Sequence, residues 1–412
     1  MTAQLNQAAD APAPKMSPAM FAFLIFVCML VMLFEGFDIQ ALGVVAPIVM
    51  PLLGLDPAQA GQVFSAAQIG VVLGALIGGK LSDIWGRRNV LILATVIFGA
   101  FTLATAFAFN FYSLLLVRAI AGFGLGAAMP NVIGMAVEAA PPKHRIKAVT
   151  MIMAGMPMGG ACVSLFAALF MKNFGWESLF WIGGVLPIIL AGFLFILPDI
   201  RIARPKPDAA ATARKDGIGV LFSEGRVLST LLLWCVLLMT ASVLYMMLNW
   251  LPSLMTARGF DLSLAQMTSM VFNLVSVVGT LAFGVIVDRY GYKQALPLAF
   301  VGFLAGICGM AFTGDPTPLL ISVGITGFFM MGAQYSLNGI TPMYYPPAVR
   351  GLGTGAALAV GRIGSIIGPL IAGYVFKAGY GPVGVALTMI PMVVIAGLAM
   401  LVLARKSRVL ES

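Results

Sequence analysis

Long apolar runs, each ended by a short polar turn, recur along almost the whole chain. A run of about 20 apolar residues is long enough to cross a lipid bilayer as an α-helix. We count twelve such runs, which predicts twelve transmembrane helices. Their expected ranges are 19–48, 58–80, 89–109, 112–140, 147–171, 178–198, 227–256, 264–287, 294–313, 317–345, 350–377 and 381–404.

The twelve runs form two groups of six, separated by a polar segment that is rich in proline, alanine and basic residues. This pattern predicts an all-α polytopic membrane protein with two six-helix, pseudo-symmetric halves. The expected parts are a disordered cytoplasmic tail at 1–18, a first domain at 19–198, a cytoplasmic linker at 199–226, a second domain at 227–404 and a tail at 405–412.

Composition supports this class, because 60% of the residues are hydrophobic, only 9% are charged, and the mean hydropathy is +1.01. A soluble domain could not bury this much apolar surface, whereas lipid covers it. The net charge of +9 does not indicate nucleic acid, since no basic patch interleaved with aromatic residues is present. The four cysteines lie in apolar runs without metal-ligand spacing, so we expect no metal site.

The basic residues fix the expected orientation. If the N-terminus is cytoplasmic, nineteen of the 24 Lys and Arg residues fall on the cytoplasmic side. Only Lys172, Arg258 and Lys377 fall on the other side, and two arginines lie within helices. Cytoplasmic loops carry an excess of basic residues, so both termini are predicted to be cytoplasmic.

A short motif is repeated at corresponding places in the two halves. Residues 79–88 read GKLSDIWGRR and residues 284–293 read GVIVDRYGYK, so both contain Gly-x-x-x-Asp-x-x-Gly followed by a base. We expect the first glycine to allow close helix approach and the second to allow a tight turn. The aspartate would accept hydrogen bonds near a helix end. This internal repeat is the strongest architectural signal in the sequence.

Two carboxylates, Glu35 and Asp38, lie in the middle of the first apolar run. A charged residue there costs about 2.5–3.5 kcal/mol on insertion scales, so intramembrane acids usually have a function. The two residues are three apart and share one helix face. Because neighbouring carboxylates repel each other, one of them should hold a proton. The pair is therefore a candidate proton-binding site, or alternatively a structural pair that neutralises buried arginines.

Two arginines are also placed within apolar runs. Arg118 is followed by Gly122 and Gly126 at steps of four, which would let a neighbouring helix approach closely. Arg118 cannot lose its charge, so it should pair with Asp38 or Glu35, either for proton transfer or only to hold the bundle together. Arg362 lies near the middle of the eleventh run, where it is also expected to meet a carboxylate.

These four charges cancel, and the balance predicts a mechanism. A carboxylate substrate alone would leave the site anionic, whereas a carboxylate and a proton together keep it neutral. We therefore expect symport of a monoanion with at least one proton. Arg362 would hold the carboxylate through a bidentate fork, aromatic rings would stack on the substrate, and amides would bind hydroxyl groups or other helices. The expected substrate-binding residues are Arg362, Tyr245, Asn249, Trp250, Asn273, Gln334 and Asn338.

Several of these motifs resemble known families. The loop at 79–88 resembles the signature of the major facilitator superfamily between helices 2 and 3, and residues 118–126 resemble its helix 4 motif. The segment 35–38, which reads EGFD, and the glycine-rich run 350–369 resemble the aromatic acid:proton symporter family. Many members have Asp where Glu35 stands. The Glu form is most similar to transporters of 3-(3-hydroxyphenyl)propionate.

The resemblance implies proton-coupled import of an aromatic carboxylate, such as a hydroxyphenylpropionate or hydroxybenzoate, across the bacterial inner membrane. It implies no cofactor besides the coupling proton and no nucleic-acid partner, and we expect a monomer. Glu35, Asp38 and Arg118 would carry the coupling, and Glu138 would pair with a base of the 79–88 loop. The expected cytoplasmic gate comprises Gly79, Asp83, Gly86, Arg87, Arg88, Glu138, Arg145, Asp288 and Arg289.

Two other functions remain open at this stage. A proton-driven exporter of drugs or metabolites would use the same helices, and a non-transporting receptor for aromatic acids would need the same binding residues. A membrane enzyme is not indicated, because the sequence contains no nucleophile–His–acid set and no nucleotide-binding loop.

Overall fold

The structure is a computed structural model that describes residues 16–141, 144–198, 217–347 and 349–406. Within these ranges the chain is helical and contains no strand. Most of the two predicted tails and most of the predicted linker lie outside the described residues. The described end of the linker forms a short 3₁₀ helix, η2 (Ile218–Phe222).

The first half of the chain forms six membrane crossings. The fifth crossing is made by two consecutive helices, α6 and α7, which only Ala154 separates. The helices are α2 (Pro18–Leu52), α3 (Pro57–Trp85), α4 (Arg87–Thr105), α5 (Phe111–Ala139), α6 (Arg145–Met153), α7 (Gly155–Phe174) and α8 (Glu177–Leu194).

The second half repeats this arrangement with six long helices. They are α10 (Val227–Thr256), α11 (Leu262–Tyr290), α12 (Tyr292–Phe312), α13 (Pro316–Ile340), α14 (Arg350–Val375) and α15 (Gly381–Lys406). A 3₁₀ turn, η3 (Thr341–Tyr344), follows α13, and a π-helical turn, η4 (Phe376–Tyr380), joins α14 to α15.

The predicted number of crossings agrees with the structure. Eleven segments of the described chain are long and apolar enough to cross a membrane, but the last of them, 350–405, contains 56 residues. That is far longer than one crossing needs. The backbone leaves the helical conformation at Gly379, where φ is +87°, and the segment divides into α14 and α15. Each of the twelve predicted runs therefore corresponds to a crossing.

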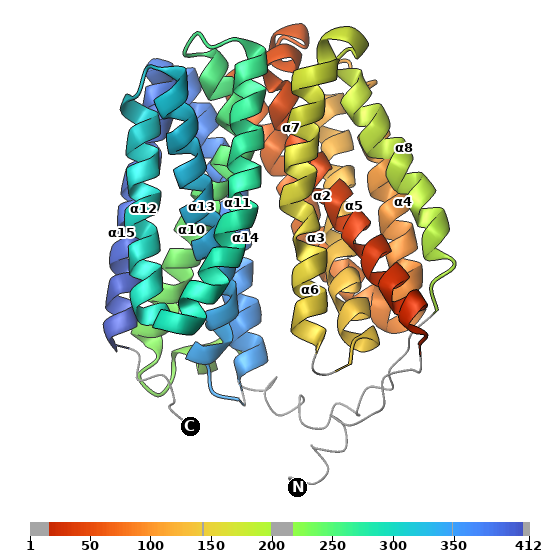
Figure 1. Ribbon diagram of the computed structural model, residues 1–412, viewed down its shortest axis with the longest axis vertical. Helices are drawn as coiled ribbons and strands as arrows, with labels where there is room; N and C mark the ends of the chain where they lie inside the picture. The colour runs from red at the N-terminus through yellow and green to blue at the C-terminus, as the bar shows by residue number, and fades with distance from the viewer. Residues whose placement is uncertain (1–15, 142–143, 199–216, 348, 407–412) are drawn as a thin grey trace, which may run out of the picture.

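The two halves lie side by side and pack in the same way (Figure 1). In the first half α3 packs on α5, α2 on α7, and α4 on α8. The equivalent helices of the second half form the equivalent pairs, α11 with α13, α10 with α14, and α12 with α15. We call the end at which α2 begins and α15 ends the terminal end, and the opposite end the distal end (Figure 1).

The glycines after Arg118 provide the predicted close helix approach. A Cβ atom on Gly122 would lie 2.0 Å from the carbonyl oxygen of Ala67, and one on Gly126 would lie 1.9 Å from that of Val71. Gly70 on α3 is equally close to the Ala119 carbonyl oxygen, so the two backbones are in direct contact. This contact positions α3 against the helix that carries Arg118.

The repeated loop motif is confirmed for its second glycine and corrected for its first. Gly86 and Gly291 have φ values of +86° and +78° and end α3 and α11, where a side chain would be strained. A Cβ atom on Gly79 or Gly284 would meet nothing within 4 Å, so the predicted close approach is absent there. In the first half Gly78 makes the close approach instead, because a Cβ atom on it would lie 2.7 Å from the Ala127 side chain. Gly79, the next residue, points about 100° away from this contact.

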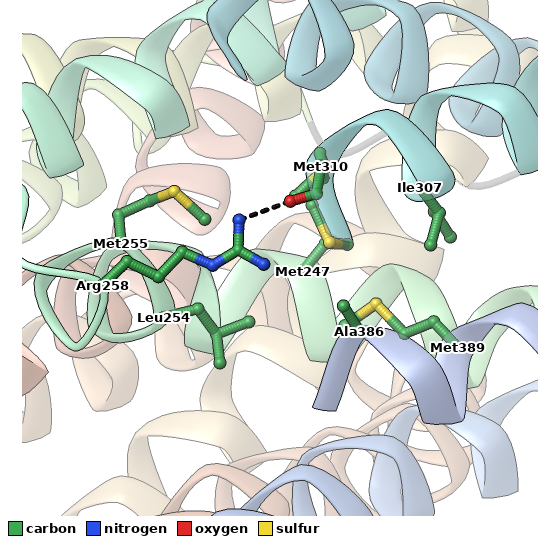
Figure 2. A pocket seen from close by; sticks show the side chains of 8 residues that line it. All are labelled: Met247, Leu254, Met255, Arg258, Ile307, Met310, Ala386 and Met389. Atoms are coloured by element: carbon green, nitrogen blue, oxygen red, sulfur yellow. Dashed lines mark hydrogen bonds between the residues drawn. The ribbon is translucent and has the colours of Figure 1, made fainter. Parts of the chain in front are cut away.

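At the distal end of the second half, Arg258 closes the end of α12. Its guanidinium donates to the main-chain oxygens of Met310 and Ala311, two of the last carbonyls of that helix, which have no partner within it. Figure 2 shows this side chain among Met247, Met255 and other apolar residues. A cation also suits the negative end of the helix dipole, so Arg258 has a structural explanation.

We predict that Gly126→Ala destabilises the protein, whereas Gly192→Ala does not. The added methyl group at 126 meets the Val71 backbone, and such overpacking costs about 1–3 kcal/mol. A methyl group at 192, within α8, meets nothing within 4 Å. Thermal unfolding of the purified proteins in detergent should show a lower Tm for Gly126→Ala only. Equal Tm values for the two variants would contradict the described contact.

Candidate functional site

A cavity of about 400 Å³ lies between the two halves. This volume is within the range of pockets that hold small organic ligands. Its polar lining comes mostly from the second half, and its thioether lining comes from both halves. The polar and sulfur-containing lining residues are Gln40, Met129, Met153, Met156, Tyr245, Asn273, Met331, Gln334, Tyr335, Asn338, Arg362 and Ser365.

The two halves are joined on the distal side of this cavity. The Lys377 ammonium lies 2.9 Å from the carboxylate of Asp56. Further into the interface the Ser65 hydroxyl donates to the Ile366 carbonyl oxygen at 2.7 Å. The cavity itself extends toward the terminal end, as far as Ala75 on α3 and Leu358 on α14. The structure is therefore closed at the distal end.

Arg118 and Asp38 form a buried bidentate ion pair. Nη1 and Nη2 of Arg118 donate to the two carboxylate oxygens at 2.9 and 2.7 Å, and Nη2 also lies 3.2 Å from the Asp38 carbonyl oxygen. Thr102 on α4 donates to the same carboxylate at 2.5 Å. Arg118 therefore pairs with Asp38, one of the two partners expected from the sequence. Neither side chain is among the residues that line the cavity.

Glu35 differs from Asp38 although the two residues share one face of α2. It is 2% exposed, and its Oε2 atom has no hydrogen-bond partner among the described residues. It lies within electrostatic reach of both Arg362 and Asp38. The next residue, Gly36, lines the cavity. Glu35 is therefore a buried acid that can still form a hydrogen bond through Oε2.

Arg362 lies at the wall of the cavity without a carboxylate at ion-pair distance in the described chain. Its Nη1 atom is 3.4 Å from the Tyr245 hydroxyl, and its Nη2 atom is 3.3 Å from the Met129 sulfur. The prediction that Arg362 meets a carboxylate is thus wrong for a carboxylate of the described chain at hydrogen-bonding distance. Its two neighbours are weak acceptors, so the guanidinium keeps its capacity to bind an anion.

Tyr245, Asn273, Gln334 and Asn338 line the cavity as expected. The Gln334 amide nitrogen is 3.5 Å from the Asn338 oxygen, and the Gln334 amide oxygen has no partner among the residues described. Asn273 is paired with Gln40 of the first half. Three elements, α10, α11 and α13, thus deliver amide and phenol groups to one wall.

Two residues predicted to bind substrate do not reach this cavity. Trp250 is fully buried, donates its indole N–H to the Pro369 carbonyl oxygen at 3.2 Å, and stacks on Phe376. The Asn249 amide donates to the Tyr245 carbonyl oxygen at 2.8 Å, one turn earlier in α10. Asn249 shares the helix face of Tyr245 but lies one turn further toward the distal end, beyond the cavity lining, whereas Trp250 lies on another face of α10.

The residues expected to form a cytoplasmic gate lie at the terminal ends of the helices. Arg87 pairs with Glu138 at 2.6 Å, which is the contact that the family resemblance implied. Arg88 donates to the Leu197 carbonyl oxygen at 2.8 Å, and Arg145 lies 3.4 Å from that of Ala140. These contacts stay within the first half. In the second half, Asp288 and Arg289 lie in the last turn of α11, and Arg289 lies over the Tyr290 ring.

Sequence reasoning missed several residues that line the cavity. Gln40 is a polar residue in the first apolar run. A polar group in a membrane-spanning helix needs a partner or a function, so the argument made for Glu35 and Asp38 also applies to Gln40. Met129, Met153 and Met156 carry no comparable signal, because a methionine in an apolar helix fits packing as well as ligand contact.

The comparisons with known proteins agree with the fold. Residues 28–332 and 256–411 match the family model described as Major Facilitator Superfamily. The chain is 37% identical over 400 residues to the 3-(3-hydroxy-phenyl)propionate transporter of Escherichia coli (strain K12), covering 96% of this chain and 97% of that one. It is 34% identical over 394 residues to the gallate transporter of Pseudomonas putida, covering 88% and 87% of the two chains.

Solved structures show the same fold at lower identity. A bacterial homologue of the human lysosomal transporter Spinster matches with a TM-score of 0.78 and 16% identity, covering 95% of this chain and 98% of that chain. A D-xylose-proton symporter matches with a TM-score of 0.74 and 17% identity, covering 93% and 96%.

We predict that the Asp56–Lys377 pair makes distal closure sensitive to strong acid only. The hydrogen bond from Lys377 and the backbone N–H of Gln59 lower the pKa of Asp56 below its ordinary value of 3.8. Asp56 has a lower pKa when it is paired with Lys377 in the closed state. Near neutral pH the pair therefore contributes fully to the stability of the closed state. The contribution is lost as the pH falls below about 4 and through the lowered pKa.

The measurement uses spin labels at positions 109 and 312, which lie in different halves at the distal end, in a background without the four native cysteines. Asp56→Asn keeps an N-cap for α3 but removes the charge. This variant should weaken closure at pH 7 by less than about fivefold, since exposed pairs contribute under about 1 kcal/mol. Its label distances should then not change further in acid, whereas those of the wild type should.

Proposed function

This chain belongs to the Major Facilitator Superfamily and is a transporter, and we propose that it imports an aromatic carboxylate together with a proton by alternating access. The two relatives already described are named for 3-(3-hydroxy-phenyl)propionate and gallate. A third relative, the 4-hydroxybenzoate transporter of Pseudomonas aeruginosa, is 32% identical over 389 residues and covers 87% of this chain. All three named substrates combine a ring, a carboxylate and at least one hydroxyl group.

The observation that carries the proposal is Arg362, a cation at the cavity wall whose protein contacts are a phenol and a thioether. A substrate carboxylate would replace these weak contacts with two parallel charge-assisted hydrogen bonds. The rings of Tyr245 and Tyr335 offer aromatic faces in the same cavity. The unpartnered amide oxygen of Gln334 would accept a hydrogen bond from a ring hydroxyl.

Charge balance supports coupling to a proton. The Asp38–Arg118 pair is neutral as a unit, so Glu35 and Arg362 are the deep charges that remain. When a substrate carboxylate binds Arg362, an ionised Glu35 would leave one uncompensated negative charge in a site of low dielectric constant. A proton on Glu35 removes that charge. Substrate and proton therefore favour each other, which is what symport requires.

The distribution of basic residues supports an orientation in which the terminal end and both termini are cytoplasmic. The distal closure described above would then separate the cavity from the outside of a bacterial inner membrane. In the opposite state, the predicted gate residues at the terminal ends, including Arg87 and Glu138, would close the cytoplasmic side. We propose that the protein works as a monomer, because one chain contains both walls of the cavity.

The coupling is tested with purified protein in liposomes and radiolabelled 3-(3-hydroxyphenyl)propionate and 4-hydroxybenzoate. We predict that an inward proton gradient drives accumulation of at least one of them. Glu35→Gln should abolish accumulation above equilibrium but retain exchange of internal for external substrate, because it mimics the protonated acid. The control Glu224→Gln removes a carboxylate that is 75% exposed and should behave as wild type. Depletion instead of accumulation would identify an exporter, and binding without flux would identify a receptor.

We also predict that Arg362→Lys weakens substrate binding about tenfold or more, because one ammonium cannot reproduce the bidentate geometry of a guanidinium. The control Arg350→Lys changes an arginine at the start of the same helix, where its Nε atom lies 3.4 Å from the Tyr345 carbonyl oxygen. Equilibrium binding of labelled substrate to detergent-solubilised protein measures the effect. An unchanged Kd for Arg362→Lys would remove this residue from the site.

A further inference from the structure

Gln40 of α2 and Asn273 of α11 form a reciprocal amide pair between the two halves. The Gln40 amide nitrogen donates to the Asn273 oxygen at 3.0 Å, and the Asn273 nitrogen donates to the Gln40 oxygen at 2.7 Å. The two side chains are 4% and 0% exposed. Two bonds in opposite directions require both amides to keep one orientation, so this contact is specific to the present arrangement of the halves.

The surroundings of the pair hold it in place. The Asn273 nitrogen also donates to the Ser269 carbonyl oxygen at 2.8 Å, which fixes the side chain on its own helix. Gly160 of α7 packs against both amides. A Cβ atom on this residue would be 1.9 Å from the Gln40 nitrogen and 2.6 Å from the Asn273 oxygen. Gly160 is therefore the residue that leaves space for the pair.

The pair lies where the cavity meets the distal contact. Gln40 is the most distal residue of α2 that lines the cavity, and Asn273 is the lining residue from α11. One turn further along α2, the backbone of Gly43 is so close to α10 that a Cβ atom would lie 2.7 Å from the Asn249 carbonyl oxygen. The two halves are thus in direct contact at the pair and one turn beyond it on the distal side.

We propose that the Gln40–Asn273 pair is the distal gate of the transport site, joined when the halves are closed at that end and separated when they open. This rests on the proposed alternating access. A buried amide that loses its partner is strongly disfavoured, so the pair can separate only as water or a solute reaches it. Opening then presents two amides, with donors and acceptors, to a hydroxylated substrate at the entrance.

The experiment measures distances between the spin labels at positions 109 and 312 in reconstituted protein without substrate. Gln40→Leu and Asn273→Leu each leave one amide without its partner from the other half, and each should raise the ratio of open to closed molecules about tenfold. Gly160→Ala should do the same although both amides are still present. Gly324→Ala, where the nearest atom would be 3.6 Å from the added Cβ, is the matched control and should leave the ratio unchanged.

Two further variants keep the test independent of folding. Gln40→Asn with Asn273→Gln retains one amide on each half and should stay closer to wild type than either leucine variant. The double leucine variant removes both amides and should open less than the sum of the single changes, because no orphan amide remains. If the single variants and Gly160→Ala keep the wild-type distances, the pair is not the gate. These distances do not depend on substrate identity or proton coupling, so failure of the proposed substrate or of the proposed coupling would leave this result standing.

Discussion

The buried ion pair between Asp38 and Arg118 determines how the other charges of this membrane protein can act. An arginine in the hydrocarbon region cannot lose its proton, so it needs an anion that matches it. Asp38 supplies both carboxylate oxygens, and Thr102 adds a third helix to the contact. Removing one partner of such a pair costs about 3–5 kcal/mol, because the other charge is left uncompensated. The pair therefore joins α2, α4 and α5 into one unit.

A consequence of this pairing is that the two acids of α2 differ in their contacts. Asp38 is occupied by three donors and stays with its arginine, so its replacement would disturb the fold and the transport site together. Glu35, one turn away, has an oxygen with no partner among the described residues and lies within electrostatic reach of the cavity arginine. The i, i+3 spacing thus places one acid in a buried ion pair and the other beside the cavity without an ion pair in the described chain.

The sequence predicted the twelve crossings, the two halves, the helix approach at Gly122 and Gly126, and the turn glycines Gly86 and Gly291. These features follow from run length, spacing and backbone conformation, which are local properties. The direction in which a side chain points was less predictable. A helix that is apolar on all sides has little amphipathic signal, so Tyr245, Asn249 and Trp250 looked alike although only Tyr245 lines the cavity. Trp250 lies on another face, and Asn249 lies on the same face one turn beyond the cavity. The same limit concealed the pairing of Gln40 with Asn273 across 233 positions.

The separation of Glu35 from Arg362 gives the strongest reason to assign different ligands to them. If the two formed a direct ion pair, a substrate carboxylate would have to displace Glu35 and would leave it buried and charged. In the structure Arg362 instead contacts Tyr245 and Met129, which a carboxylate displaces at little cost. In the proposed mechanism, the charge of Glu35 would oppose the incoming anion until Glu35 takes a proton. The site would then have one group for the anion and another for the proton, on opposite halves of the protein. Loading both would neutralise the site, so the halves could close around it without trapping a net charge in the membrane.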